Sequence, residues 1–355
     1  MKNSEARLQN IRIDAEDTIL NAIKQMDKLG KKLLLVFAEG KFDSLLSIGD
    51  VQRAIIKNKS LDTPIRQILR KDVEVAYENK SKEEIHKRML ENRTECMPVL
   101  DTKGELSEVI FWEDIVGNSE KRIKRNLDLP VVIMAGGKGT RMRPITNVLP
   151  KPLIPLGEKS MIEQIMEKFI DIGCLYFYVT LNYKAEFIRQ YFSMPGKDER
   201  ANITFIEEEK FLGTAGSLNL LKNKISQTFF VSNCDILIDQ DYGEIMDYHR
   251  EQNNEMTIVA ALKHYSIPYG ILETGKNGAL LSITEKPDFT FQINSGMYIL
   301  EPHLLTEVPE NKFFHITDLM KQIKDRKGRI GVFPVSEKSW KDIGNWEEYL
   351  KEIKD

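Results

Sequence analysis

The clearest chemical pattern in the chain is a loop of glycines and cations near its middle. The apolar run Val131–Ala135 is followed by three glycines within residues 136–139, then by Arg141, with Lys151 ten residues further on. Such a run is typical of a buried strand that opens into a loop. Glycines let backbone N–H groups approach phosphate oxygens closely, and the cations neutralise phosphate charge. We therefore expect this loop to bind a triphosphate.

Two familiar phosphate-binding signatures do not fit this loop. A Walker A loop needs Gly-Lys-Ser/Thr after four variable residues, and a dinucleotide fingerprint needs Gly-x-Gly-x-x-Gly. Here Gly139 is followed directly by Thr140 and Arg141. The loop therefore predicts a nucleotide site of another kind.

A second group that can do chemistry is a carboxylate at the end of an apolar run. Residues 228–232 are mostly apolar and are followed by Asn233, Cys234 and Asp235. Burying a carboxylate there is costly unless a cation or hydrogen-bond donors meet it. Carboxylates acting together with phosphates are typical ligands of Mg²⁺. Asp235 is therefore a candidate metal ligand, with helix capping as the alternative role.

Alternating strands and helices must position these groups. After about residue 128, strands are predicted at 131–135, 175–181, 203–206 and 228–232, and helices at 161–172, 185–192 and 215–221. This alternation favours an α/β domain over 128–355 with a Rossmann-like, mixed and mainly parallel sheet. Ligands of such sheets bind at the carboxyl ends of the strands, where the glycine-rich loop falls.

The first 122 residues have a different organisation, the order β-α-β-β-α repeated in copies at about 1–66 and 67–122. The first copy is predicted as strand 11–13, helix 18–29, strands 33–37 and 44–48, and helix 50–56. The second is predicted as strand 73–75, helix 82–90, strands 97–100 and 109–111, and a helix from Trp112. The basic segment 120–126 is expected to be a solvated linker.

The central loop resembles that of the sugar-1-phosphate nucleotidylyltransferase family, Gly-Gly-x-Gly-Thr-Arg-[Leu/Met]-x-Pro with a later Lys-Pro. Other segments resemble elements of the same family: Leu212–Ser217, Tyr269-Gly270, Glu285-Lys286-Pro287, 294–298 and Trp340–Trp346. No spacing argument brings Asp342 to Asp235, and only the resemblance does. The acidic segment 207–210 is expected to be a solvated loop, with the alternative that its first acid, Glu207, meets a base amide or the ribose. Thr214 is expected to cap the helix that follows it.

The resemblance implies a role for each matching residue. The implied nucleotide-binding residues are Ala135, Gly136, Gly137, Gly139, Thr140, Arg141, Lys151, Gly213, Thr214, Ala215 and Asn233, with Gly213 and Gly216 admitting the base. The implied sugar phosphate-binding residues are Gly270, Glu285, Lys286, Asn294 and Gly296. Arg141, Lys151 and Asp235 are implied to be catalytic, and Asp235 and Asp342 to bind Mg²⁺.

The N-terminal repeat resembles tandem cystathionine-β-synthase-type (CBS) domains, which commonly bind adenine nucleotides between the two copies. Their recurring element is Gly-x-x-[Thr/Ser]-x-x-Asp, of which the first copy keeps Ser47 and Asp50 and the second keeps Asp114. These three are candidate ligands of a regulatory nucleotide. Two alternatives stay open: the acids only cap helices, and the pair only supports dimerisation.

For function, the resemblance implies transfer of a nucleoside monophosphate from an NTP to a hexose 1-phosphate, releasing pyrophosphate. GTP and glucosamine 1-phosphate are expected, and the product would serve surface-glycan or nonulosonic acid biosynthesis. Mannose 1-phosphate with GTP, or UTP or dTTP as donor, are the alternatives. A non-enzymatic, nucleotide-sensing CBS protein is the alternative of a different class.

Composition narrows the partners and the location. The 355 residues are 41% hydrophobic and 30% charged, with a net charge of −3, so nucleic acid is not an expected partner. No apolar run approaches the twenty residues of a membrane span, and the polar N-terminus is not a secretory signal. Three scattered cysteines indicate buried free thiols in a reducing cytoplasm. A homo-oligomer is expected.

Overall fold

The computed structural model describes residues 10–70, 73–81, 84–85, 88–89, 96–111, 126–197 and 199–352. The chain divides into two compact units, unit 1 over 1–123 and unit 2 over 124–355, and each is described by itself. The expected helix from Trp112, Asp114 and most of the basic linker lie outside the described residues.

Unit 1 begins with a three-stranded sheet and two helices. Its elements are β1 (Arg12–Asp14), α2 (Ile19–Leu29), β2 (Leu33–Ala38), β3 (Lys41–Ser47) and α3 (Ile48–Ile56). The ends of α2 follow from its flanking residues: the Thr18 hydroxyl accepts from the Asn21 N–H, and Gly30 closes the helix in the left-handed conformation. Ile19, Ala22, Ile23 and Met26 form its buried face.

The second part of unit 1 repeats this sheet. It contains η1 (Ile65–Gln67), β4 (Ala76–Tyr77), β5 (Cys96–Leu100) and β6 (Leu106–Phe111). β1 pairs with β2 in parallel and β2 with β3 antiparallel, and β4, β5 and β6 pair in the same two ways. The two sheets therefore share one topology, as a repeat requires.

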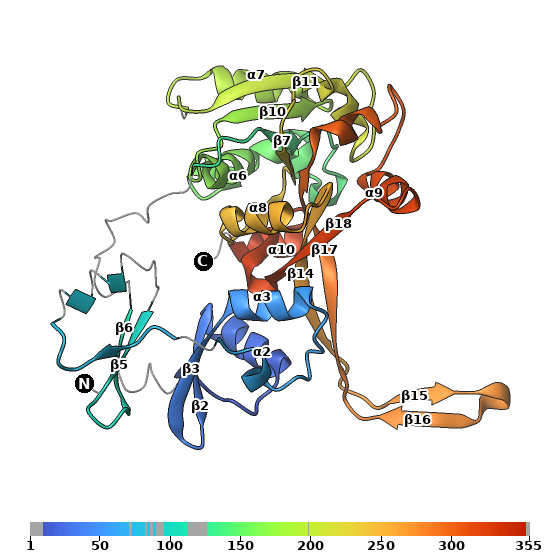
Figure 1. The fold of residues 1–355 in the computed structure, drawn as a ribbon. Coiled ribbons are helices and arrows are strands. Elements are labelled where there is room, and N and C mark those ends of the chain that lie inside the picture. Colours follow the sequence, from blue (N-terminus) through green and yellow to red (C-terminus); the bar gives the residue numbers. More distant parts are fainter. Residues whose placement is uncertain are drawn as a thin grey trace. The chain divides into compact units, whose positions relative to one another are not determined.

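Unit 2 is built on a seven-stranded sheet of order β11-β10-β7-β12-β17-β14-β18 (Figure 1). The strands are β7 (Val131–Met134), β10 (Tyr176–Leu181), β11 (Asn202–Glu207), β12 (Phe229–Asn233), β14 (Met256–Ser266), β17 (Asp288–Leu300) and β18 (Ile330–Ser336). Four of the six pairings are parallel and the two made by β17 are antiparallel. The expected mixed, mainly parallel α/β sheet is confirmed.

The helices of unit 2 are α6 (Met161–Ile170), α7 (Ala185–Ser193), α8 (Tyr242–Glu251), α9 (Ile316–Asp325) and α10 (Trp346–Glu352). Aromatic packing fixes two of them against the sheet. Phe169 of α6 lies 5.3 Å from Phe230 of β12 and 4.9 Å from Tyr242 of α8, measured between ring centroids. Burial of a ring of this size contributes about 1.5–3 kcal/mol. These contacts therefore pack α6 against β12 and α8.

One predicted helix is wrong in type. Residues 215–221 were expected to form an α-helix, but Gly216–Leu221 is a 3-10 helix, η5. The N–H groups of Ala215 and Gly216 both donate to the Phe314 carbonyl, at 3.0 and 3.1 Å. These hydrogen bonds to a distant segment of the same chain replace those of the first turn of a regular helix.

Three two-stranded sheets complete unit 2. They are β8 (Pro155–Leu156) with β9 (Lys159–Ser160), β13 (Ile236–Ile238) with β19 (Trp340–Asp342), and β15 (Ile271–Thr274) with β16 (Leu280–Thr284). The short 3-10 helices η6 (Lys276–Gly278) and η8 (Glu337–Ser339) lie between strands, and η7 (Pro302–Thr306) lies between β17 and α9. Among the described residues, no helix combines the length and apolarity needed to cross a membrane.

Candidate active site

The glycine-rich loop follows the carboxyl end of β7, which lies between β10 and β12 in the sheet. It continues through η2 (Thr140–Met142), η3 (Ile145–Asn147) and η4 (Lys151–Leu153). Gly139 has a φ of +61°, and a β-carbon there would lie 2.9 Å from the Lys151 β-carbon. Only glycine permits this approach, so Gly139 allows the loop backbone to pack directly against the Lys151 side chain.

Lys151 and Arg141 both face Asp235, which follows β12. The Lys151 ammonium is paired with the Asp235 carboxylate, and both side chains are only 10% exposed. The Arg141 guanidinium is 61% exposed and lies 3.7 Å from Asp235 and 3.8 Å from Asp342. The structure therefore gathers two cations and two carboxylates from three distant parts of the sequence.

Pairing of two short strands places Asp342 in this cluster. Ile236 of β13 lies opposite Asp342 of β19, and the Ile343 N–H donates to the Asp235 carbonyl at 2.9 Å. At the level of sequence, only the family resemblance placed Asp342 near Asp235. In the structure the antiparallel pairing of β13 and β19 brings the two residues together.

Gly344 leaves a small space between the two carboxylates. A β-carbon at Gly344 would lie 2.5 Å from Asp235 Oδ2, 2.6 Å from Asp342 Oδ1 and 2.8 Å from an Arg141 nitrogen. Two carboxylate oxygens facing one such space suit a hard divalent cation, which takes further ligands from phosphates and water. Asp235 and Asp342 are therefore the residues that could hold a divalent metal ion.

Glu208 is a site residue that the sequence interpretation missed. Segment 207–210 was expected to be solvated, and that was wrong for Glu208, which is 4% exposed. A β-carbon at Gly136 would lie 2.9 Å from its carboxylate, so Glu208 borders the glycine-rich loop. Burial raises the pKa of Glu208, although hydrogen bonds from the Leu212 N–H and the Ser217 and Thr180 hydroxyls oppose the shift. The strand pattern could have identified Glu208, because alternate residues of a strand share one face and Ile206, two residues earlier, is buried.

The glycines of segment 212–217 have a packing role in this structure. A β-carbon at Gly213 would lie 2.6 Å from the Phe314 carbonyl oxygen, and one at Gly216 would lie 2.7 Å from that of Lys312. Both glycines therefore allow two backbone segments to cross. Thr214 does not cap the helix that follows it, because its hydroxyl accepts from the Ile316 N–H at the start of α9.

Part of the expected sugar side lies beside β12. The Gly296 N–H donates to the Asn294 side chain at 3.1 Å, and a β-carbon at Gly296 would lie 2.5 Å from the Asn233 amide nitrogen. The Trp340 indole N–H donates to the Ser295 carbonyl at 3.2 Å. Asn233, Asn294 and Gly296 are thus neighbours of the β13–β19 pair.

The rest of the expected sugar side lies on a projecting arm, residues 265–291. Glu285 packs against Gly270, where a β-carbon would lie 2.9 Å from its carboxylate, and Lys286 follows in the left-handed conformation. The strand from Asp288 to Asn294 spans about 20 Å at an ordinary rise per residue. Figure 1 shows the arm extending away from the seven-stranded sheet. In this structure Glu285 and Lys286 are therefore apart from Asn294.

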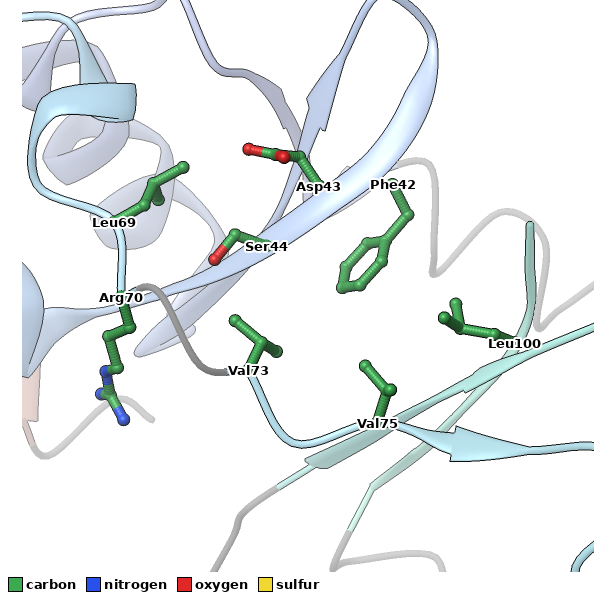
Figure 2. Close-up of a pocket in the computed structure, with 8 residues that line it drawn as sticks. All are labelled: Phe42, Asp43, Ser44, Leu69, Arg70, Val73, Val75 and Leu100. Atoms are coloured by element: carbon green, nitrogen blue, oxygen red, sulfur yellow. The ribbon is translucent and has the colours of Figure 1, made fainter. Parts of the chain in front are cut away.

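Unit 1 contains a cavity of about 400 Å³ lined by residues of both sheets. Figure 2 shows Phe42, Val73, Val75 and Leu100 directed into one space. Arg70 also lines it, and its guanidinium donates to Asp50 at 2.7 Å and to the Ser47 hydroxyl at 2.7 Å. The candidate ligands Ser47 and Asp50 are thus engaged with each other and with Arg70.

Asp50 also completes a capping box with Ser47 at the start of α3 and pairs with Arg53. Burial opposes ionisation, but the hydrogen bonds from Arg70 and Ser47 outweigh it and lower the pKa of Asp50. The helix-capping alternative therefore describes Asp50 in this structure.

Two other groups of reactive side chains are accounted for by packing. All three cysteines are buried, as expected, and Cys174 and Cys234 are free thiols. Burial raises the pKa of Cys234 to about 12. Glu255, His303 and Glu307 come close enough to share a metal ion, but Arg326 bonds both carboxylates.

Comparison with known proteins agrees with this geometry. The nucleotidyl transferase family model matches residues 130–355, and the CBS domain model matches 65–121. The catalytic subunit beta of mannose-1-phosphate guanylyltransferase from Drosophila melanogaster is 32% identical over 224 residues, 62% of this chain and 60% of that protein. A UTP–glucose-1-phosphate uridylyltransferase from Synechocystis is 31% identical over 246 residues, 64% of this chain and 63% of that protein.

A solved structure has the same catalytic fold. HddC from Yersinia pseudotuberculosis aligns with a TM-score of 0.51 and 28% identity over 64% of this chain and 98% of its own. The chain spans about three fifths of the length of the curated relatives it matches. Because the family model covers more than half of the chain, the protein belongs to the nucleotidyl transferase family and carries a CBS domain before the transferase domain.

Proposed function

We propose that the protein transfers a guanylyl group from GTP to a hexose 1-phosphate, with glucosamine 1-phosphate as the expected acceptor. The observation that carries the proposal is the convergence of Arg141, Lys151, Asp235 and Asp342 beside a glycine-rich loop. The resemblance is to bacterial guanylyltransferases of the legionaminic acid route. Mannose 1-phosphate is the alternative acceptor that the fruit-fly relative's name favours.

Guanylyl transfer requires the protein to neutralise the negative charge of the phosphates, and it needs no covalent enzyme intermediate. An oxygen of the sugar phosphate attacks the α-phosphorus of GTP, the bond from that phosphorus to the bridging oxygen breaks, and pyrophosphate leaves with the electron pair. Lys151 and Arg141 are placed to neutralise the charge on the phosphates. Asp235 and Asp342 would hold Mg²⁺, which, when bound, supplies further charge neutralisation.

Glu208 supports GTP as the donor. Its buried carboxylate accepts hydrogen bonds and lies against Gly136 of the loop. The guanine edge offers adjacent N–H donors that a carboxylate can accept, whereas uracil and thymine offer one N–H between two carbonyls. A solved structure of HddC contains GMP-PN, and its alignment has a TM-score of 0.50 and 26% identity.

Pyrophosphate release tests the proposal. The full chain with Mg²⁺ is assayed with GTP, UTP, dTTP and CTP against the 1-phosphates of glucosamine, mannose, glucose and N-acetylglucosamine. Release confined to GTP with one acceptor would support the proposal and identify the sugar. Release with UTP or dTTP in preference would overturn the donor assignment, and silence across all pairs would overturn the activity.

A second proposal concerns unit 1, whose cavity would bind a regulatory nucleotide. The cavity of about 400 Å³ is within the size range of small-ligand sites and joins the two sheets of unit 1. AMP is a suitable probe because it lacks the triphosphate that the transferase loop requires. Calorimetric titration of the full chain should show AMP binding that Val75→Trp abolishes. No binding to the unaltered chain would leave unit 1 with a purely structural role.

A cytoplasmic location is also proposed, because free thiols such as those of Cys174 and Cys234 are most readily maintained in a reducing compartment.

A further inference from the structure

The arm, residues 265–291, concentrates apolar surface to an unusual degree. Eight large apolar side chains within it are 36% to 75% exposed. The four aromatic rings among them alone expose on the order of 400 Å² together, since an aromatic side chain carries about 150–250 Å², and four Leu and Ile side chains add to that area. A specific interface buries about 800 Å² from each partner. The apolar area of the arm is therefore of the order that one side of a stable interface needs.

The hairpin at the end of the arm has one apolar and one polar face. Leu272 of β15 lies opposite Ile283 of β16, and Leu281 lies two residues from Ile283 on the same face. These three side chains are 61%, 58% and 69% exposed. On the other face Ser282 donates to Glu273 at 2.8 Å. Such alternation of apolar and polar side chains is typical of a strand pair whose apolar face packs against another surface.

The stem of the arm continues this pattern. Tyr265 lies opposite Phe289 in the β14–β17 ladder, and Phe291 stacks on Phe289 with ring centroids 6.2 Å apart. All three rings are exposed by a third or more. An isolated two-stranded hairpin is marginal in water, so the arm gains stability from a cover over these side chains.

A second copy of the chain is the partner that matches the arm best. Among the described residues of unit 1, the large apolar side chain exposed to a comparable degree is Tyr77 alone. The arm carries Glu273, Glu285 and Asp288 against Lys276 and Lys286, so its near-neutral charge gives no attraction to a polyanion. Two identical arms related by a twofold axis would match in area and in apolar character.

We propose that the arm is a self-association surface, on which the apolar face around Leu272, Leu281 and Ile283 packs against the arm of a second copy. The proposal does not rest on the proposed activity, and turnover is not its readout.

Assembly mass tests the proposal in the full chain. Sedimentation across a concentration series should show association of the unaltered protein, and Leu281→Lys should raise the dissociation constant more than about tenfold. Met194→Lys is the matched control, because Met194 is also about half exposed and lies at the end of α7. A monomer at every concentration, or equal association of Leu281→Lys and the unaltered protein, would overturn the proposal.

Cross-linking identifies what covers the arm. Leu281→p-benzoylphenylalanine is irradiated in a mixture of unlabelled and ¹⁵N-labelled chains, and the cross-linked peptides are identified by mass spectrometry. Mixed-isotope peptides that join two arms are the expected result. Cross-links confined to one chain, whether to unit 1 or to the transferase site, would show that the arm folds onto its own chain and would overturn the proposal.

Discussion

Asp50 of unit 1 and Asp235 of unit 2 are both buried aspartates that face two cations, yet their surroundings differ. Asp50 is bonded by Ser47, Arg53 and Arg70, two of which are within three residues of it. Asp235 is paired with Lys151 and faces Arg141 only at 3.7 Å, and both partners are distant in sequence. Asp50 is saturated by local capping, which stabilises a helix. The cations that face Asp235 could also pair with a bound phosphate, as the chemistry of a reaction site requires.

The strongest test of this contrast is removal of the Asp235 carboxylate. We expect Asp235→Asn to lower the rate of pyrophosphate release by about a thousandfold or more, because it loses a metal ligand and leaves Lys151 buried beside a neutral group. The same loss is expected for Lys151→Ala. Circular dichroism should show an intact fold in both variants. A folded variant with near-normal turnover would remove its residue from the catalytic set.

The space beside Gly344 offers a subtler way to disturb the same cluster. Gly344→Ala would place a methyl group within 3 Å of both aspartates and Arg141, and those side-chain ends can move without breaking the fold. We expect turnover to fall about a hundredfold, since displacement of reacting groups by about 1 Å has costs of that order. Gly49→Ala is the control, because its nearest contact is an ordinary 3.4 Å. Equal activity of the two variants would mean that the Gly344 space is not used.

Glu208 extends the comparison to a third buried acid, one bonded by neutral donors. Glu208→Gln should lower kcat/KM for GTP by about ten- to a hundredfold and narrow the preference over UTP, since an amide presents one acceptor in place of two.

The pKa of Glu208 gives that prediction a pH signature. Because burial raises this pKa above the usual 4.5, the carboxylate is protonated as pH falls through the raised value, and one of its oxygens then becomes a donor in place of an acceptor. The KM for GTP should therefore rise toward low pH in the unaltered enzyme and stay flatter in Glu208→Gln. Parallel pH profiles would contradict the role of Glu208 in base binding.

Local sequence pattern predicted four of the seven strands of the sheet, and β14, β17 and β18 were not among them. The strands at 131–134, 176–181 and 229–233 lie within a residue or so of their apolar runs, because a buried parallel strand must be apolar throughout. The loop after β7 could be predicted for the same reason, since its glycines and cations are local in sequence.

Contacts between distant segments could not be predicted from such patterns. Asp342 reaches Asp235 through β13–β19 pairing across about a hundred residues, and Gly213 is required by the Phe314 backbone. Three consecutive acids at 207–209 are typical of a solvated loop, and only the three-dimensional packing shows that the middle one is buried. The sequence could not predict the arm either. Apolar and polar residues alternate in its strands as in any half-buried strand, and only the structure shows that its apolar side chains are exposed.

The smallest effect on turnover is expected at Asp50. Asp50→Asn should leave pyrophosphate release nearly unchanged but lower the free energy of unfolding of unit 1 by about 1–3 kcal/mol, less than a fully buried ion pair because both arginines are more than half exposed. Since folding lowers the pKa of Asp50, its stabilisation is present above the unfolded value of 3.8 and is lost as pH falls toward the folded one. The stability difference between the two proteins, measured by thermal unfolding, should therefore be constant near neutral pH and shrink below about pH 3.8. A large loss of turnover at neutral pH in folded Asp50→Asn would instead make Asp50 a functional residue, and the contrast with Asp235 would fail.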